Sequence, residues 1–163
     1  ISAAYYSLAA AATKGDLFHD NPTLDGLAFI NRDADGEYDA IEYLRNNADR
    51  ASAVLEAVGD DYTPFGRISA STGVPTVLGW PGHEVQWRGS AALQGSRDQD
   101  VATIYRTNDI NVAKSLLSKY RVNYVYVGRR EREKYSEEGI GKFSEFMELV
   151  FDDGGVLLYH WEL

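Results

Sequence analysis

The 163-residue sequence contains no cysteine and a single methionine, Met147. Without cysteine, the chain forms no disulfide, holds no metal through thiolates and has no cysteine nucleophile. This absence does not fix the compartment, because cytosolic and extracytoplasmic proteins can both lack cysteine. The first residue is Ile1 and not methionine, so we expect the chain to be a piece of a longer protein.

Basic residues and long apolar runs are also scarce. The 16 Lys and Arg are outnumbered by 25 Asp and Glu, which gives a formal net charge of −9. Because nucleic-acid-binding domains present a basic face, we exclude nucleic acid as a partner. No run of about 18 apolar residues is present, so the sequence predicts no complete membrane span. The nearest candidate, residues 1–12 (ISAAYYSLAAAA), fits either an Ala-rich helix or the exit of an upstream membrane helix.

The remaining composition is typical of a soluble globular domain, with 44% hydrophobic and 25% charged residues. We assign residues 1–22 to an N-terminal tail or membrane-exit segment. Residues 23–163 are long enough for one domain but short for two. We therefore predict a single α/β domain after the tail.

Three apolar runs predict the strands of this domain. Residues 51–58, 75–78 and 123–127 each end at a glycine that opens a polar loop. Helical periodicity between the second and third runs predicts a strand–helix–strand unit, which requires a parallel crossover. Residues 156–161 predict a closing edge strand, either parallel or antiparallel. The expected fold class is α/β, with a mainly parallel sheet flanked by helices in two or three layers.

Helices are predicted where apolar residues recur at a spacing of three and four. These helices begin at Gly36 and cover residues 98–105, 111–120 and 143–150. Asp109 or Asn108 is the expected N-cap of the third helix. The charged segment 129–138 (RREREKYSEE) predicts a solvated helix face.

The polar loops after the predicted strands contain the candidate site. In parallel α/β sheets, ligands lie outside the carboxyl ends of the strands. We therefore expect loops 60–66, 80–89 and 129–135 to meet at one rim. The candidate ligand-binding residues are Asp60, Asp61, Tyr62, Arg67, Trp80, His83, Glu84, Trp87 and Arg88.

The second of these loops combines aromatic and polar chemistry. Tryptophan offers a flat apolar face and arginine a rigid fork of donors, so this loop predicts a sugar- or peptide-binding surface. The alternative is structural: the two tryptophans cover the sheet end and Arg88 pairs with Asp60 or Asp61. One of these acids is also expected to cap a helix that begins near Pro64.

Motifs for cofactors and covalent catalysis are absent. The sequence has no second histidine at HExxH spacing after His83 and Glu84, and neither GxGxxG nor GxxxxGK[ST] occurs. The GxSxG elbow of serine hydrolases is missing as well. We predict no cofactor and no zinc site, while a weakly held cation with oxygen ligands stays open.

Several blocks of the sequence resemble the C-terminal soluble part of proteins of the YYY family. The members of this family are large multi-spanning membrane proteins of bacteria and archaea. The resemblance covers most of the chain from Thr23 onward. The matching blocks are TLDG at 23–26, VLEAVGDDYTPFGRISASTGVPTVLGWPGHEVQWRG at 54–89, Asp100-Val101 with Ile104-Tyr105, and LLSKYRVNYVYVGRREREKY at 116–135.

That family is in turn similar to membrane glycosyltransferases that use lipid-linked sugar donors. Residues 59–62 (GDDY) take the place of the WWDYG loop of the oligosaccharyltransferase catalytic subunit, and residues 124–127 (YVYV) the place of its YVLV strand. The parts match in order and type, although the paired tryptophan is missing. The resemblance implies an extracytoplasmic domain on the cell membrane that is non-catalytic alone. It also implies two partners, the upstream membrane helices and a glycan or peptide acceptor.

Two other functions stay open. One is a structural or interaction module that docks through its Trp-rich loop on its own membrane helices or on a partner. The other is an independent hydrolase that uses Asp61 and His83. A ligand site predicts a concave pocket with His83 and Arg88 pointing in, whereas a docking surface predicts Trp80 and Trp87 exposed beside apolar neighbours.

Overall fold

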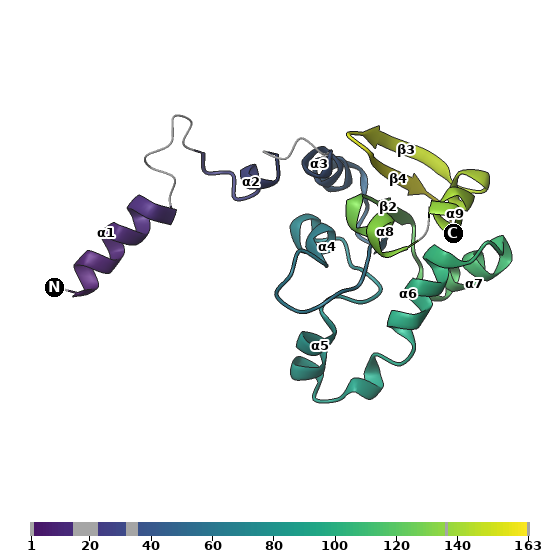
Figure 1. Cartoon of the computed structure of the whole chain (residues 1–163), viewed down its shortest axis with the longest axis horizontal. Coiled ribbons are helices and arrows are strands. Elements are labelled where there is room, and N and C mark those ends of the chain that lie inside the picture. The colour runs from purple at the N-terminus through teal and green to yellow at the C-terminus, as the bar shows by residue number, and fades with distance from the viewer. Residues whose placement is uncertain (1, 15–22, 32–35, 136, 163) are drawn as a thin grey trace.

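The computed structural model describes residues 2–14, 23–31, 36–135 and 137–162. Helix α1 (Ser2–Lys14) covers most of the predicted tail, and Figure 1 draws it apart from the other elements. Its side chains Tyr5, Tyr6 and Leu8 are exposed. Among the helices described, none combines the length and the apolar character that crossing a bilayer requires. The rest of the predicted tail, residues 15–22, lies outside the described residues.

Within the described residues, the centre of the fold is a four-stranded sheet of order β1-β2-β4-β3. Strand β1 (Val54–Leu55) runs parallel to β2 (Tyr124–Val127). Strand β4 (Val156–His160) pairs antiparallel with β2 and with β3 (Glu148–Asp153). The prediction that this segment is an edge strand is wrong, because β3 pairs along its other side and takes the edge position. The α/β class with flanking helices is confirmed. The sheet is mostly antiparallel and not mainly parallel as predicted, because the run 75–78 adds only a bridge and the β3–β4 hairpin supplies two of the four strands. Parallel pairing is confined to the β1 side, where a bridge also joins Val54 to Thr76.

Helices cover both faces of the sheet because the side chains of β2 alternate between two hydrophobic clusters. Val125 and Val127 face the first cluster, together with α6 (Arg97–Arg106) and α7 (Ile110–Tyr120). Tyr124 and Tyr126 face the second cluster. That cluster also contains buried residues of α3 (Glu37–Asn47) and α4 (Arg67–Thr72). The domain therefore has three layers, with the sheet in the middle (Figure 1).

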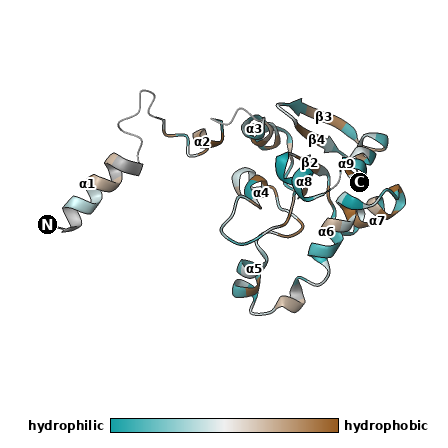
Figure 2. Cartoon of the chain, in the orientation of Figure 1, coloured by the Kyte–Doolittle hydropathy of each residue, from teal (hydrophilic) through white to brown (hydrophobic). Residues whose placement is uncertain are grey.

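Several local signals in the sequence have the predicted effect. Helix α3 follows Gly36, and α6 and α7 cover the two predicted helices between the strands. Asp109 caps α7, with its carboxylate accepting from the backbone N–H groups of Asn111 and Val112. The charged segment forms α8 (Arg129–Lys134), which Figure 2 colours as strongly hydrophilic. The shorter elements are α2 (Ala28–Asn31), α5 (Pro81–Arg88), α9 (Glu137–Gly141) and the 3-10 turns Ala91–Leu93 and Lys142–Glu145.

Two predicted elements are wrong. Residues 143–150, predicted as a helix, form a 3-10 turn followed by β3, because the hairpin through Gly154 and Gly155 pairs β3 with β4. Residues 80–89, predicted as a loop, form helix α5 with Pro81 in its first turn. It ends at Gly89, whose φ of 71° is left-handed. Proline at the start and glycine after the end are ordinary helix boundaries.

Two predicted strands are also shorter than expected. The run 51–58 contributes only the two residues of β1 to the sheet, although its last five residues are all buried. The run 75–78 contributes only the bridge at Thr76. Both runs therefore contribute mainly to the core and only little to the sheet.

Candidate functional site

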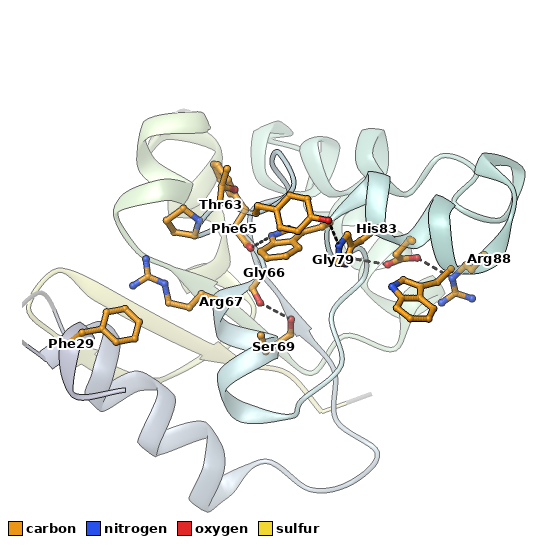
Figure 3. A pocket seen from close by; sticks show the side chains of 15 residues that line it. Phe29, Thr63, Phe65, Gly66, Arg67, Ser69, Gly79, His83 and Arg88 are labelled. Atoms are coloured by element: carbon orange, nitrogen blue, oxygen red, sulfur yellow. Dashed lines mark hydrogen bonds and ion pairs between the residues drawn. The ribbon is translucent and has the colours of Figure 1, made fainter. Parts of the chain in front are cut away.

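The loop after β1, the start of α4 and helix α5 form the walls of an open cavity of about 790 Å³. This volume is within the range of small-molecule sites, roughly 300–1,000 Å³. Of the nine candidate residues, seven line the cavity: Tyr62, Arg67, Trp80, His83, Glu84, Trp87 and Arg88. Asp60 and Asp61 are not part of its lining. We call this cavity the aromatic pocket (Figure 3).

Three rings in the lining of the aromatic pocket contact one another. The centroid of Tyr62 lies 5.3 Å from that of Trp80 and 4.9 Å from that of His83, and the Trp80 and His83 rings are 5.4 Å apart. The Tyr62 hydroxyl and His83 Nε2 are hydrogen-bonded at 2.8 Å. Edge-to-face and tilted contacts of this kind stabilise aromatic clusters by about 0.5–1.5 kcal/mol per pair. The rings are therefore held in place before any ligand arrives.

Tyr62 occupies its position at a conformational cost. Its φ of 59° is left-handed, which a bulky side chain rarely adopts. Such a conformation costs roughly 1–2 kcal/mol per residue. The ring is nevertheless 74% exposed, so burial does not offset this cost. The backbone strain places an aromatic face at the mouth of the pocket.

A hydrogen bond to the first loop fixes Trp80. Its Nε1 donates to the carbonyl oxygen of Phe65 at 2.5 Å, as Figure 3 shows. The Phe65 ring packs directly on Gly59, where an added Cβ would lie 2.0 Å from the ring. The glycine after the first apolar run thus allows the loop to fold back and support the Trp80 ring.

Helix α5 supplies the polar wall of the pocket. Glu84 accepts from the backbone N–H of Gly79 at 3.1 Å and forms an ion pair with Arg88 Nε at 3.2 Å. The predicted pairing of Arg88 with Asp60 or Asp61 is therefore replaced by a pair within the helix. Trp87, one residue before Arg88, is 83% exposed.

The paired acids of the first loop are engaged outside the pocket. Asp61 Oδ1 accepts from the backbone N–H of Gly82 at 3.0 Å, in the first turn of α5. The backbone carbonyl of Asp60 accepts from the Thr63 hydroxyl at 2.5 Å. The expectation that one of them caps a helix near Pro64 is wrong, because that helix begins at Arg67. Asp61 supports α5 instead.

A buried acid that we did not predict caps α4. Glu56 follows β1 directly, and its two carboxylate oxygens accept from the backbone N–H groups of Ile68 and Ser69 at 3.0 and 2.9 Å. Burial raises the pKa of Glu56 to about 7, against the lowering effect of these hydrogen bonds. A single acid within the apolar run ASAVLEAV was the signal for such a residue, because buried carboxylates require donors.

A second buried acid joins the third loop to the end of β1. Glu131 on α8 accepts from Ala57 N at 2.8 Å and from Gly128 N at 2.9 Å. Burial raises its pKa as well. Lys134 Nζ donates to the carbonyl oxygen of Val58 and lies 5.5 Å from the Phe65 ring. The three loops thus meet at one end of the sheet, but residues 129–135 support the pocket and do not line it.

The two residues of the hydrolase alternative have different partners. Asp61 accepts from Gly82 N, whereas the His83 ring bonds the Tyr62 hydroxyl. A histidine that acts as a general base is normally oriented by a carboxylate. The hydrogen bonds of Asp61 and His83 therefore do not form the carboxylate–histidine pair that the hydrolase alternative requires. Within the described residues, no group of three or more His, Asp or Glu is placed to hold a metal ion.

Comparison with known proteins adds no relative. No protein-family model, no curated protein and no solved structure matches this chain.

Proposed function

We propose that this chain is an extracytoplasmic, non-catalytic domain of a membrane glycosyltransferase-like protein of the YYY type. In this proposal the aromatic pocket binds the acceptor, which is a glycan or a peptide. The upstream membrane helices are its structural partner and supply the catalytic groups. The observation that carries the proposal is the cluster of Tyr62, Trp80 and His83 in the lining of an open cavity.

The lining of this pocket combines ring faces with polar groups, as a site for a sugar or peptide requires. The apolar faces of sugar rings and of peptide side chains pack on flat aromatic surfaces such as Tyr62 and Trp87. Polar groups at the edges, among them His83, Glu84 and Arg88, are within the same lining and can hydrogen-bond hydroxyl or amide groups. The strained backbone of Tyr62 is also in keeping with a functional role, because strain of this kind is common at binding sites.

A titration followed by NMR tests this proposal. The chain has 3 tryptophans, and their indole N–H signals are separate probes. Trp80 and Trp87 line the pocket, while Trp161 packs on Phe146 and is an internal reference. We expect oligosaccharides or short peptides to shift the Trp80 and Trp87 signals and leave Trp161 unchanged. Absence of any shift across both panels at millimolar concentrations would contradict the proposal.

A docking module is the second candidate, and one observation favours it. Phe29, Tyr62 and Trp87 are exposed large apolar side chains around the same opening. Exposed apolar patches of this kind also mark protein interfaces. A Trp87→Cys variant of the full-length protein separates the two functions, because docking protects the thiol from alkylation without added ligand. Ligand binding alone leaves the thiol reactive until a ligand is added.

A further inference from the structure

Arg67 lies at the end of the aromatic pocket remote from Arg88. Its guanidinium is 5.8 Å from the centre of the Phe29 ring, and Figure 3 shows it reaching from the start of α4 toward that ring. Its Nη1 lies 2.8 Å from Glu37 Oε1. The Arg67 side chain is only 20% exposed. A buried carboxylate and an aromatic ring thus hold this arginine in one orientation.

Glu37 forms ion pairs with two arginines. Its other oxygen, Oε2, lies 2.7 Å from Nη1 of Arg130, whose side chain is 17% exposed. In the ion pairs between described residues, the two guanidinium groups of Arg67 and Arg130 share the single carboxylate of Glu37. A partly desolvated charge is costly unless it has a partner. Arg88 lies at the opposite end of the pocket and differs in this respect. In the described ion pairs, it is the single partner of Glu84.

We propose that the ligand of the aromatic pocket carries an anionic group, a carboxylate or a phosphate, that binds Arg67. This inference rests on the proposed function and specifies the chemical class of the ligand. The guanidinium of arginine matches both groups, since its planar fork donates two parallel hydrogen bonds. The ring or apolar part of the ligand lies on Tyr62 and Trp80, which line the same cavity. An anion there gives Arg67 a second negatively charged partner beside the carboxylate that it shares with Arg130, in a chain whose net charge of −9 otherwise repels anions.

Calorimetric titration of the chain with matched probes tests this proposal. The probes are naphthalene-2-carboxylate, 2-naphthyl phosphate and the neutral naphthalene-2-carboxamide. All three offer the same ring system to the aromatic residues, so they differ mainly in the charged group. We expect the better of the two anions to bind at least about tenfold more tightly than the amide, which is the contribution of a hydrogen bond to a charged group. Which anion binds better distinguishes a carboxylate-bearing ligand from a phosphate-bearing one.

Variants of Arg67 assign the effect to this residue. Arg67→Gln should remove the preference for the anion, whereas Arg67→Lys should retain part of it because the charge stays. Arg45→Gln is the matched control: Arg45 also forms an ion pair, with Glu42, and is not part of the pocket lining. It lowers the net charge equally and should leave the preference unchanged. Circular dichroism of each variant verifies that the domain is folded.

The possible results separate the two proposals. Equal binding of the anions and the amide to the wild-type chain would overturn the anion site and leave the pocket intact. Equal loss of anion binding in Arg67→Gln and Arg45→Gln would also overturn it, because net charge would then explain the preference. If no probe binds and no glycan or peptide shifts the Trp80 and Trp87 signals, both proposals fail together.

Discussion

The buried acids Glu56 and Glu131 and the pocket residues Tyr62 and Trp80 lie at the same end of the sheet, yet their surroundings differ. Each buried acid uses both oxygens to accept from backbone N–H groups that join one element to another. Tyr62 and Trp80, in contrast, form few hydrogen bonds and leave ring surface open to the pocket. The buried acids therefore support the fold, whereas the aromatic residues have binding capacity that the fold itself does not use.

The largest effect that distinguishes the two regions should come from Glu131→Ala. The substitution leaves the N–H groups of Ala57 and Gly128 buried without their acceptor. Each unsatisfied group costs about 1–3 kcal/mol, so the free energy of unfolding should fall by roughly 4 kcal/mol. Urea unfolding measures this change. Glu133→Ala on the same helix is the control, because Glu133 is exposed and should change stability by less than about 0.5 kcal/mol. Equal effects of the two variants would remove the structural role of Glu131.

Glu56 should make stability dependent on pH. Its pKa is about 7 in the folded chain and 4.5 ordinarily, because burial disfavours the charged form. Below pH 4.5 the carboxyl is protonated in both states and its contribution is complete. As the pH rises toward 7, only the unfolded chain releases the proton, so stability falls. The loss is on the order of 3 kcal/mol and is complete above the folded pKa.

Urea unfolding of the wild-type chain and Glu56→Gln between pH 4.5 and 8 measures this dependence. Glutamine does not titrate, so the difference in the free energy of unfolding between the two proteins should change in favour of the variant as the pH rises. A constant difference over this range would show that Glu56 stays ionised in the folded chain.

Tyr62→Gly tests the pocket residues in the same comparison. Glycine adopts the φ of 59° without strain, while the lost ring is mostly exposed. We expect the free energy of unfolding to change by less than about 1 kcal/mol, because relief of strain offsets the lost ring contacts. The affinity for the pocket ligand should fall, as measured by the NMR titration. A large loss of stability would place Tyr62 among the structural residues.

The sequence predicted much of this arrangement because apolar periodicity and glycine positions are local signals. Helices α3, α6 and α7 follow from spacing alone, and the pocket follows from loops that come after apolar runs. Strand β3 was not predictable in the same way, because Phe143, Met147 and Val150 repeat at helical spacing. Pairing of residues 148–153 with β4 across the hairpin decides the conformation of this segment. An edge strand that is fixed by such long-range pairing does not show a regular alternation of apolar and polar residues in its sequence.

The buried acids were missed for a different reason. Pattern reasoning assigned chemistry to the adjacent pair Asp60 and Asp61, which are the more conspicuous residues. The fold instead buries Glu56, the residue directly after β1, under the first turn of α4. Which backbone N–H groups become buried depends on packing, so the residue that satisfies them is identified only once the elements are placed.

Trp87→Ala, measured for stability and for binding on the same sample, tests the division between the two regions most directly. Trp87 is 83% exposed and lines the aromatic pocket. We predict that the free energy of unfolding stays within about 0.5 kcal/mol of the wild-type value. We also predict that the affinity for the best glycan or peptide of the panel falls by about tenfold or more, since aromatic contacts dominate such sites. Unchanged affinity in a stably folded variant would contradict the account.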